Sequence, residues 1–214
     1  MSNLIQKTQP LETEVDQIVG LYNQGQLEQA VSLAENLAEQ YPNALILYEI
    51  LGAAYMGLKN ADKSIENYQK VLRLNPSHTD SYNNMGMALY DQGRFDEAVD
   101  SYQKAVALEP NFADGHYNLG NALKQKGEFK QAIESYKASI KINPNDAEVL
   151  LNYGKALKDN GNLFEALGKF KQVIKIKPDH AEAYNNIGIA LQEEGELTAA
   201  IDSYRKAIKI KPNY

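Results

Sequence analysis

The stretch TDSYNNMGMALYDQGRFDEAVDSYQKAVALEPNF, residues 79–112, decides the fold because the next 34 residues repeat its pattern. Residues 113–146 read ADGHYNLGNALKQKGEFKQAIESYKASIKINPND, with glycine, alanine, tyrosine and proline at the same offsets. The period of 34 continues in both directions, and prolines mark it at Pro42, Pro76, Pro110, Pro144, Pro178 and Pro212. Repetition at this length is the signature of a repeat architecture rather than of a single globular core.

Each 34-residue segment predicts two amphipathic helices. With the proline at position 32, positions 4, 7, 8 and 11 form one helical stripe, and positions 17, 20, 24 and 27 form another. In residues 79–112 the landmarks are Tyr82, Gly86, Gly93, Tyr102 and Pro110. The glycine at position 15 permits a tight turn between the helices, and the proline ends the second one. We therefore expect an all-α solenoid, in which each helix pair buries its apolar face on the neighbouring pair.

The pattern resembles the tetratricopeptide repeat (TPR), in which Trp, Leu-Gly, Tyr, Ala, Phe and Pro recur over 34 residues. The resemblance implies an α-solenoid of six helix-turn-helix repeats that forms a right-handed superhelix. After an N-terminal leader at 1–10, the predicted repeats are 11–44, 45–78, 79–112, 113–146, 147–180 and 181–214. The first repeat is degenerate. In the second we expect Asn60 at the place of the turn glycine and Ser64 at that of the alanine.

Composition excludes several function classes. The chain has 214 residues, 22 Lys+Arg against 28 Asp+Glu, a net charge of −6 and no cysteine. Thiolate metal sites and disulfides are thereby excluded, and the net charge gives no overall basic footprint for nucleic acid. The sequence lacks an apolar run long enough for a membrane span or a secretory signal. We expect a cytoplasmic protein.

The sequence contains no recognisable catalytic constellation. Its three histidines, His78, His116 and His180, lack the spacing of metal ligands, and its glycines match neither the dinucleotide fingerprint nor the P-loop. We therefore predict a protein that is not an enzyme and needs no cofactor.

Asparagine recurs at position 6 of four successive repeats. Because asparagine is a poor helix former, this recurrence needs a reason. The TPR resemblance implies that the first helix of each repeat lines a concave groove. There the pattern is similar to the asparagine ladder of the TPR superhelix in O-linked N-acetylglucosamine transferases, whose amides would bind the backbone of an extended peptide. The alternative is that duplication copied a tolerated residue. The four are Asn84, Asn118, Asn152 and Asn186.

Further groove positions are assigned from the same resemblance. We add Asn83, Asn121 and Asn185 to the partner-binding set, together with Tyr117. A carboxylate clamp of the kind that grips chaperone tails is improbable, because Tyr117, Glu182 and Asn186 stand where it needs cations. The groove stripe is otherwise acidic, so we expect a neutral or basic peptide. The acids are Asp80, Asp91, Asp114, Glu148, Asp159, Glu182 and Glu193, opposed by Lys155.

The second repeat differs from the others by being apolar on this stripe. Ile46 and Ile50 form a possible apolar groove patch of the kind that marks contact sites. The alternative is that the N-terminal segment around Leu4 and Ile5 covers them.

Three functions fit these patterns. The first is a non-catalytic protein-interaction scaffold that holds an extended partner segment in its groove. The second is the N-terminal substrate-recruiting arm of a larger glycosyltransferase or sulfotransferase, and we expect the chain to be a piece cut at a repeat boundary. The third is a head-to-tail self-assembling array. It is suggested by the apolar edge expected on the last helix and by charge, since residues 1–110 carry 7 basic and 15 acidic residues, and 111–214 carry 15 and 13.

Overall fold

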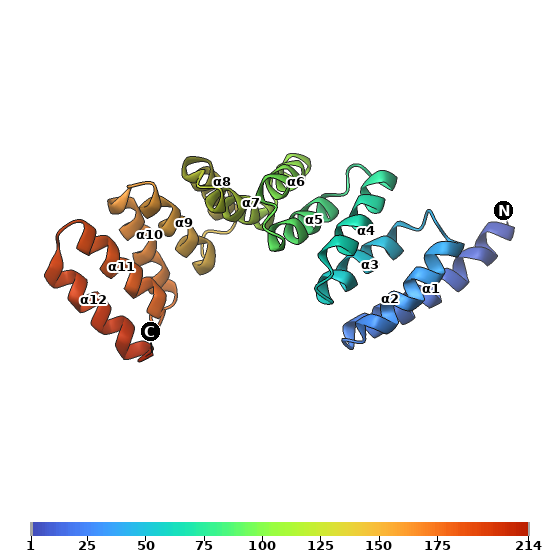
Figure 1. Cartoon of the computed structure of the whole chain (residues 1–214), viewed down its shortest axis with the longest axis horizontal. Coiled ribbons are helices and arrows are strands. Elements are labelled where there is room, and N and C mark those ends of the chain that lie inside the picture. The colour runs from blue at the N-terminus through green and yellow to red at the C-terminus, as the bar shows by residue number, and fades with distance from the viewer. Residues whose placement is uncertain (1, 214) are drawn as a thin grey trace. The chain divides into compact units, whose positions relative to one another are not determined.

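The computed structural model describes residues 2–213, with side chains described from residue 11 onward. Over residues 2–213 it contains twelve α-helices and no strand, which confirms the predicted all-α class. The chain divides into two compact units, Met1–Leu108 and Glu109–Tyr214, which we call unit 1 and unit 2 (Figure 1). None of the described helices combines the length and apolar character that a membrane span requires.

Both units consist of helices joined by short turns, and all helices except the longer α1 have nearly equal lengths. The helices of unit 1 are α1 (Ser2–Asn23), α2 (Leu27–Gln40), α3 (Leu45–Gly57), α4 (Ala61–Leu74), α5 (Thr79–Asp91) and α6 (Phe95–Leu108). Those of unit 2 are α7 (Ala113–Gln125), α8 (Phe129–Ile142), α9 (Ala147–Asp159), α10 (Leu163–Ile176), α11 (Ala181–Glu193) and α12 (Leu197–Ile210). From α2 onward, the first helix of every repeat begins and ends at the same two positions of the 34-residue period. The second helices likewise share one start and one end position.

Within each unit, successive helices pack on one another, and the first helices of neighbouring pairs also touch. In unit 1, α3 contacts both α1 and α5, and in unit 2, α9 contacts both α7 and α11. The first helices of each unit therefore lie side by side and form one continuous surface, as the solenoid prediction requires. We call this surface the first-helix face of the unit.

Within a pair, the two helices approach closely because glycine at position 8 faces an aromatic ring at position 24. A Cβ on Gly86 would lie 2.7 Å from Cε1 of Tyr102, and a Cβ on Gly120 would lie 2.7 Å from Cε1 of Tyr136. Both rings are almost fully buried. At the turn between α5 and α6, Tyr90 and Phe95 add an edge-to-face contact with centroids 5.3 Å apart.

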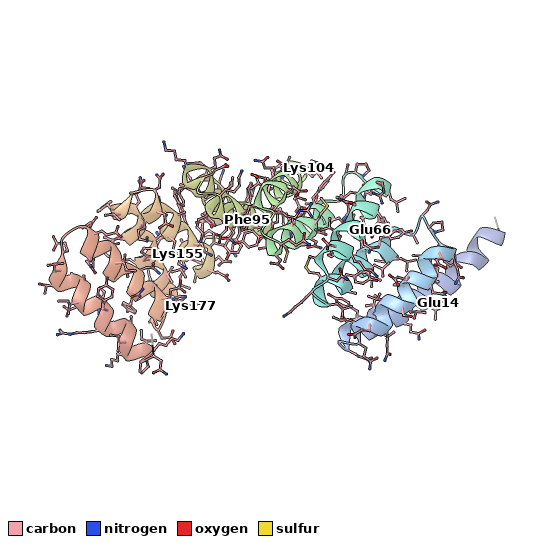
Figure 2. All side chains as sticks on the ribbon, viewed as in Figure 1. Glu14, Glu66, Phe95, Lys104, Lys155 and Lys177 are labelled. Atoms are coloured by element: carbon pink, nitrogen blue, oxygen red, sulfur yellow. The ribbon has the colours of Figure 1, made fainter. Side chains whose placement is uncertain are left out.

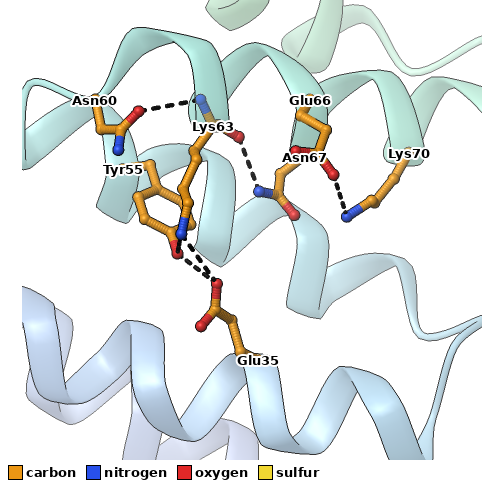
Figure 3. Close-up of polar contacts among 7 residues, drawn as sticks. All are labelled: Glu35, Tyr55, Asn60, Lys63, Glu66, Asn67 and Lys70. Atoms are coloured by element: carbon orange, nitrogen blue, oxygen red, sulfur yellow. Dashed lines mark hydrogen bonds and ion pairs between the residues drawn. The ribbon is translucent and has the colours of Figure 1, made fainter.

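The turn between paired helices needs a left-handed residue, and in the second repeat this residue is Lys59. Its φ is +58°, close to the +73° of Gly93 at the equivalent position. The expectation that Asn60 replaces the glycine was wrong by one residue. Asn60 is instead the N-cap of α4, where its Oδ1 accepts a hydrogen bond from the backbone N–H of Lys63 at 3.2 Å (Figure 3).

The alanine replacement in the same repeat is accommodated without an unpaired group. The Ser64 hydroxyl is fully buried and donates to the carbonyl of Gly52 in α3 at 2.8 Å. At the N-terminus, α1 includes residues 2–10, so the segment predicted as a leader is helical. The side chains of Leu4 and Ile5 lie outside the described residues, and the expectation that they cover Ile46 and Ile50 stays a prediction.

Candidate functional site

A pocket of about 330 Å³ opens on the first-helix face of unit 1. We call it the first-helix pocket. Its lining comes from α1, α3, α4 and α5, and consists of Val19, Tyr22, Glu49, Ile50, Ala53, Tyr68, Asp80, Ser81 and Asn84. The walls are mainly apolar, with a few convergent polar groups, which is the composition of sites that bind small groups or single side chains.

The first-helix pocket brings together residues that the sequence had assigned separately. Ile50, from the predicted apolar patch, and Asn84, the first ladder asparagine, both line it. Ile46 does not line the pocket, and its side chain is 41% exposed. One wall is formed by Val19 and Tyr22 of α1, which are each 37% exposed, whereas Tyr68 and Ser81 are nearly inaccessible and form the floor.

A contact between His78 and Glu49 borders the acidic side of the first-helix pocket. Nε2 of His78 lies 2.7 Å from Oε1 of Glu49, and Nδ1 of His78 accepts a hydrogen bond from the backbone N–H of Ser81 at 3.2 Å. His78 is thus the N-cap of α5 and orients the start of that helix. Burial raises the pKa of Glu49, His78 opposes this effect, and the nearby Asp80 adds to it.

Asn84 is already engaged with the pocket floor. Its side chain hydrogen-bonds the hydroxyl of Tyr68, and its Oδ1 lies 3.5 Å from Nδ2 of Asn83. Burial raises the pKa of Tyr68 well above its usual range, so its hydroxyl is protonated at neutral pH.

In unit 2, a hydrogen-bonded chain connects neighbouring first helices. The Tyr117 hydroxyl of α7 donates to Oε1 of Glu148 at 2.8 Å and accepts from Nδ2 of Asn152 at 2.9 Å, both in α9. Burial, more than any neighbouring group, raises the pKa of Tyr117 to about 12. Within the helix pair of α7 and α8, the Tyr136 hydroxyl of α8 donates to Oδ1 of Asn121 in α7 at 2.7 Å. These contacts fix the side chains before any ligand arrives.

The ladder asparagines lie deeper than residues that line an open groove. Asn84, Asn118 and Asn152 are only partly exposed. Asn186 is 7% exposed, and its Nδ2 donates to the carbonyl of Glu182 at 2.9 Å. Position 6 faces the first helix of the neighbouring pair, because helices that stack side by side in a solenoid cover one side of each other. Of the other predicted groove residues, Asn83 is buried and Asn185 is partly exposed.

Several groove acids are paired within the protein. Lys155 of α9 (Figure 2) forms an ion pair with Glu182 of α11, and Lys158 contacts Asp159 at 2.7 Å. Asp80, Asp91 and Asp114 are exposed. Among the residues that the structure describes, no cluster of three or more His, Asp or Glu side chains has the arrangement of a metal site.

A second hollow, of about 400 Å³, lies between α2 and α4 on the other side of unit 1. Its charged groups pair with one another (Figure 3). Lys63 Nζ lies 2.9 Å from the hydroxyl of Tyr55, which also hydrogen-bonds Glu35, and Lys70 Nζ lies 2.8 Å from Oε1 of Glu66. Because these charges already have partners, the first-helix pocket is the stronger candidate.

The sequence argument missed Ser81, Glu49 and His78 as site residues. Ser81 had a visible signal, since position 3 is occupied by Leu47, Gly115, Val149 and Ala183 in four other repeats and otherwise carries a hydroxyl only at Thr13 of the degenerate first repeat. The pairing of Glu49 with His78 joins α3 to the start of α5, and no spacing rule within one helix reveals such a contact.

Comparison with known families decides the classification. The family model described as TPR repeat matches residues 52–93, 86–127, 120–161 and 154–195. Models described as Tetratricopeptide repeat match residues 181–214 and 19–44. The chain belongs to the tetratricopeptide repeat family. Comparison of the sequence with curated proteins gives no match.

Solved TPR structures are similar in fold. YrrB, whose structure is described as that of a TPR protein with an unusual peptide-binding site, is 26% identical, with a TM-score of 0.76 over 85% of this chain and 93% of that one. MamA is also 26% identical, with a TM-score of 0.74 over 76% of this chain and 95% of that one. PilF of Pseudomonas aeruginosa shares the fold at 20% identity, with a TM-score of 0.77 over 95% and 92%.

Proposed function

We propose that this TPR protein is a non-catalytic scaffold whose first-helix face binds an extended segment of a partner protein. The observation that carries the proposal is the first-helix pocket, in which an apolar wall and the amide of Asn84 converge on one open site. An extended peptide offers backbone N–H and C=O groups at regular intervals, and partly exposed asparagine amides match both kinds of group. The likeness to YrrB, which is described as a TPR protein with an unusual peptide-binding site, supports this proposal.

The asparagine ladder proposed here has fewer peptide-contacting members than the one predicted from the sequence. We assign peptide contact to the partly exposed amides Asn84, Asn118 and Asn152, together with Asn121 and Asn185. The buried amides of Asn83 and Asn186 orient these side chains and their helices, because Asn186 already uses its N–H within α11.

The partner segment is proposed to be neutral or basic. Residues 1–110 have an excess of eight acidic residues, and exposed Asp80 and Asp91 lie on first helix α5. Electrostatic complementarity of this kind selects among partners and speeds association more than it adds affinity. Location in the cytoplasm and the absence of nucleic-acid binding stay predictions.

Selection from a phage-displayed library of random 12-residue peptides tests the proposal. Peptides that bind the full chain are synthesised, and their Kd is measured for the wild type and for Asn84→Ala, which removes the ladder amide of the first-helix pocket. A lost hydrogen bond costs about 1 kcal/mol, so binding weakens by roughly 5-fold. The control is Asn36→Ala, an exposed asparagine of α2 outside the first-helix face. Equal Kd values for all three proteins contradict the proposal.

Self-association is a second candidate, favoured by the exposed face of α12. Leu197 is 61% exposed, Ile201 50% and Ile208 53%, although each is a large apolar residue. In a solenoid such a face is covered by another helix pair, from the same chain or from a second molecule. Light scattering of this chain against concentration tests the idea. Ile201→Lys should abolish any growth in mass, and a constant monomer mass for the wild type contradicts it.

A further inference from the structure

The first-helix pocket has the size of a site for one side chain. Its volume of about 330 Å³ lies at the lower end of the range of about 300–1,000 Å³ that ligand pockets cover. Val19, Ile50 and Ala53 present apolar atoms to it. An occupant with an aliphatic stem therefore gains free energy by removing this surface from water.

The pocket floor contains a hydroxyl that lacks a partner. Ser81 is 1% exposed, and its Oγ makes no hydrogen bond. Other buried serines satisfy their hydroxyls either within their own helix, as when Ser135 donates to the carbonyl of Gln131 at 3.1 Å, or on the paired helix, as when Ser64 donates to the carbonyl of Gly52 at 2.8 Å. Ser81 is the third residue of α5, so no preceding helical turn offers it a carbonyl. Because an unpaired buried hydroxyl is unfavourable, an occupant that hydrogen-bonds Ser81 is favoured.

The electrostatic environment of the pocket calls for a cation. Glu49 and Asp80 both line it, and none of the described lining residues is a lysine or arginine. The two carboxylates disfavour each other's charge, since Asp80 contributes to the raised pKa of Glu49. His78 contacts Glu49 from the N-cap of α5, and its Nε2 lies 2.7 Å from Oε1 of Glu49. A positive group placed between the carboxylates removes this repulsion.

We propose that the first-helix pocket receives a lysine or arginine side chain of the bound peptide, an assignment that rests on the peptide binding proposed above. The aliphatic stem packs on the apolar wall, while the charged head lies beside Glu49 and Asp80 and donates a hydrogen bond to Ser81 Oγ. A purely aliphatic side chain leaves these polar groups desolvated and unpaired, and an acidic one is repelled.

A small probe tests the pocket independently of any peptide. The ¹⁵N-labelled full chain is titrated with N-acetyl-L-lysine N-methylamide and with the norleucine analogue, which lacks the ammonium group. We expect saturable amide shifts at Ser81 and Asn84 with a Kd on the order of 1 mM, as ligands of this size allow. The norleucine analogue should bind at least ~10-fold more weakly, as expected for the loss of a partly desolvated ion pair.

Matched variants separate the pocket from general electrostatics. Asp80→Asn should weaken the lysine probe by at least ~3-fold, whereas Asp114→Asn should leave it unchanged. Asp80 and Asp114 are both exposed and both lie in the first turn of a first helix, but Asp114 belongs to α7 in unit 2 and does not line the pocket. Equal affinity for the lysine and norleucine probes overturns the assignment, as does an equal effect of the two variants.

Peptides complete the test. In each selected 12-residue peptide, lysine and arginine residues are replaced one at a time by norleucine. One replacement should cost at least ~10-fold in Kd with the wild type and under ~3-fold with Asp80→Asn, because the two changes remove the same interaction. If the lysine probe binds and no peptide does, the pocket assignment stands and the scaffold proposal fails. If peptides bind without any such position, the assignment fails and the scaffold proposal stands.

Discussion

The contact between Gly154 of α9 and Phe170 of α10 sets how closely one helix pair of unit 2 packs. A Cβ on Gly154 would lie 2.5 Å from Cε1, 2.8 Å from Cδ1 and 3.0 Å from Cζ of the Phe170 ring. The ring is fully buried, so it has no space into which to withdraw. Gly154→Ala therefore forces the two helices apart or tilts the ring.

The expected cost follows from two opposing effects. Overpacking of a core costs about 1–3 kcal/mol, while replacing glycine by alanine inside a helix returns roughly 0.5–1 kcal/mol. We predict a net loss of about 1–2 kcal/mol in the free energy of unfolding. Gly168→Ala is the matched control, since Gly168 is helical and exposed and a Cβ there meets nothing within 4 Å. It should raise stability by about 0.5–1 kcal/mol.

Guanidinium unfolding followed by circular dichroism measures both variants, and hydrogen exchange of α9 and α10 locates the loss, because repeat arrays can unfold in parts. Phe170→Leu in the Gly154→Ala background should cost less than Phe170→Leu in the wild type, since the smaller side chain accepts the added methyl. If Gly154→Ala is as stable as Gly168→Ala, the close approach of glycine and ring does not govern the pairing of these helices.

Three further predictions concern the turn, the pocket and the hydrogen-bonded chain of unit 2. Lys59→Gly should stabilise the protein by about 1 kcal/mol in urea unfolding, because it removes a non-glycine residue at φ +58°. Gly93→Lys should destabilise the protein by a similar amount. Equal stability of the two variants contradicts the assigned left-handed turn. Burial raises the pKa of Glu49 in the free pocket, and a cation pairs only with its deprotonated carboxylate. The lysine probe should therefore bind more weakly as the pH falls from neutral toward this raised pKa, and Glu49→Gln should flatten that profile. Tyr117→Phe leaves Asn152 without its partner and should lower stability by about 1–2 kcal/mol, and an unchanged urea midpoint would show that the bond contributes nothing.

The architecture was predictable because every structural requirement recurs with the 34-residue period. Gly86 and Tyr102 are separated by a fixed interval that recurs at Gly120 and Tyr136, so one packing rule read from the sequence places every pair of this kind. Because each motif recurs in several repeats, one ambiguous copy does not change the predicted fold. The misassigned turn residue Lys59 shows the limit, since a lysine at a left-handed position carries no sign of it in its chemistry.

The candidate site was predictable only in part. Ile50 was identified because it is apolar on a stripe that is polar in the other repeats. Asn84 was identified because it is a poor helix former at a position where asparagine recurs. The burial of the Ser81 hydroxyl and the contact of Glu49 with His78 depend on how α3 packs against α5. The distance between two helices is a property of the packed structure. The depth of Asn186 was misjudged for the same reason, because a helical wheel describes one helix and omits its neighbours.

Mapping of a bound peptide tests the central claim most directly. The tightest 12-residue peptide from the selection is titrated into the ¹⁵N-labelled full chain, and changes in the amide spectrum are followed residue by residue. The proposal predicts that the largest changes fall on the first-helix face of unit 1, at Ile50, Ser81 and Asn84. Changes confined to α2, α4 and α6, with those three amides unmoved, would contradict it.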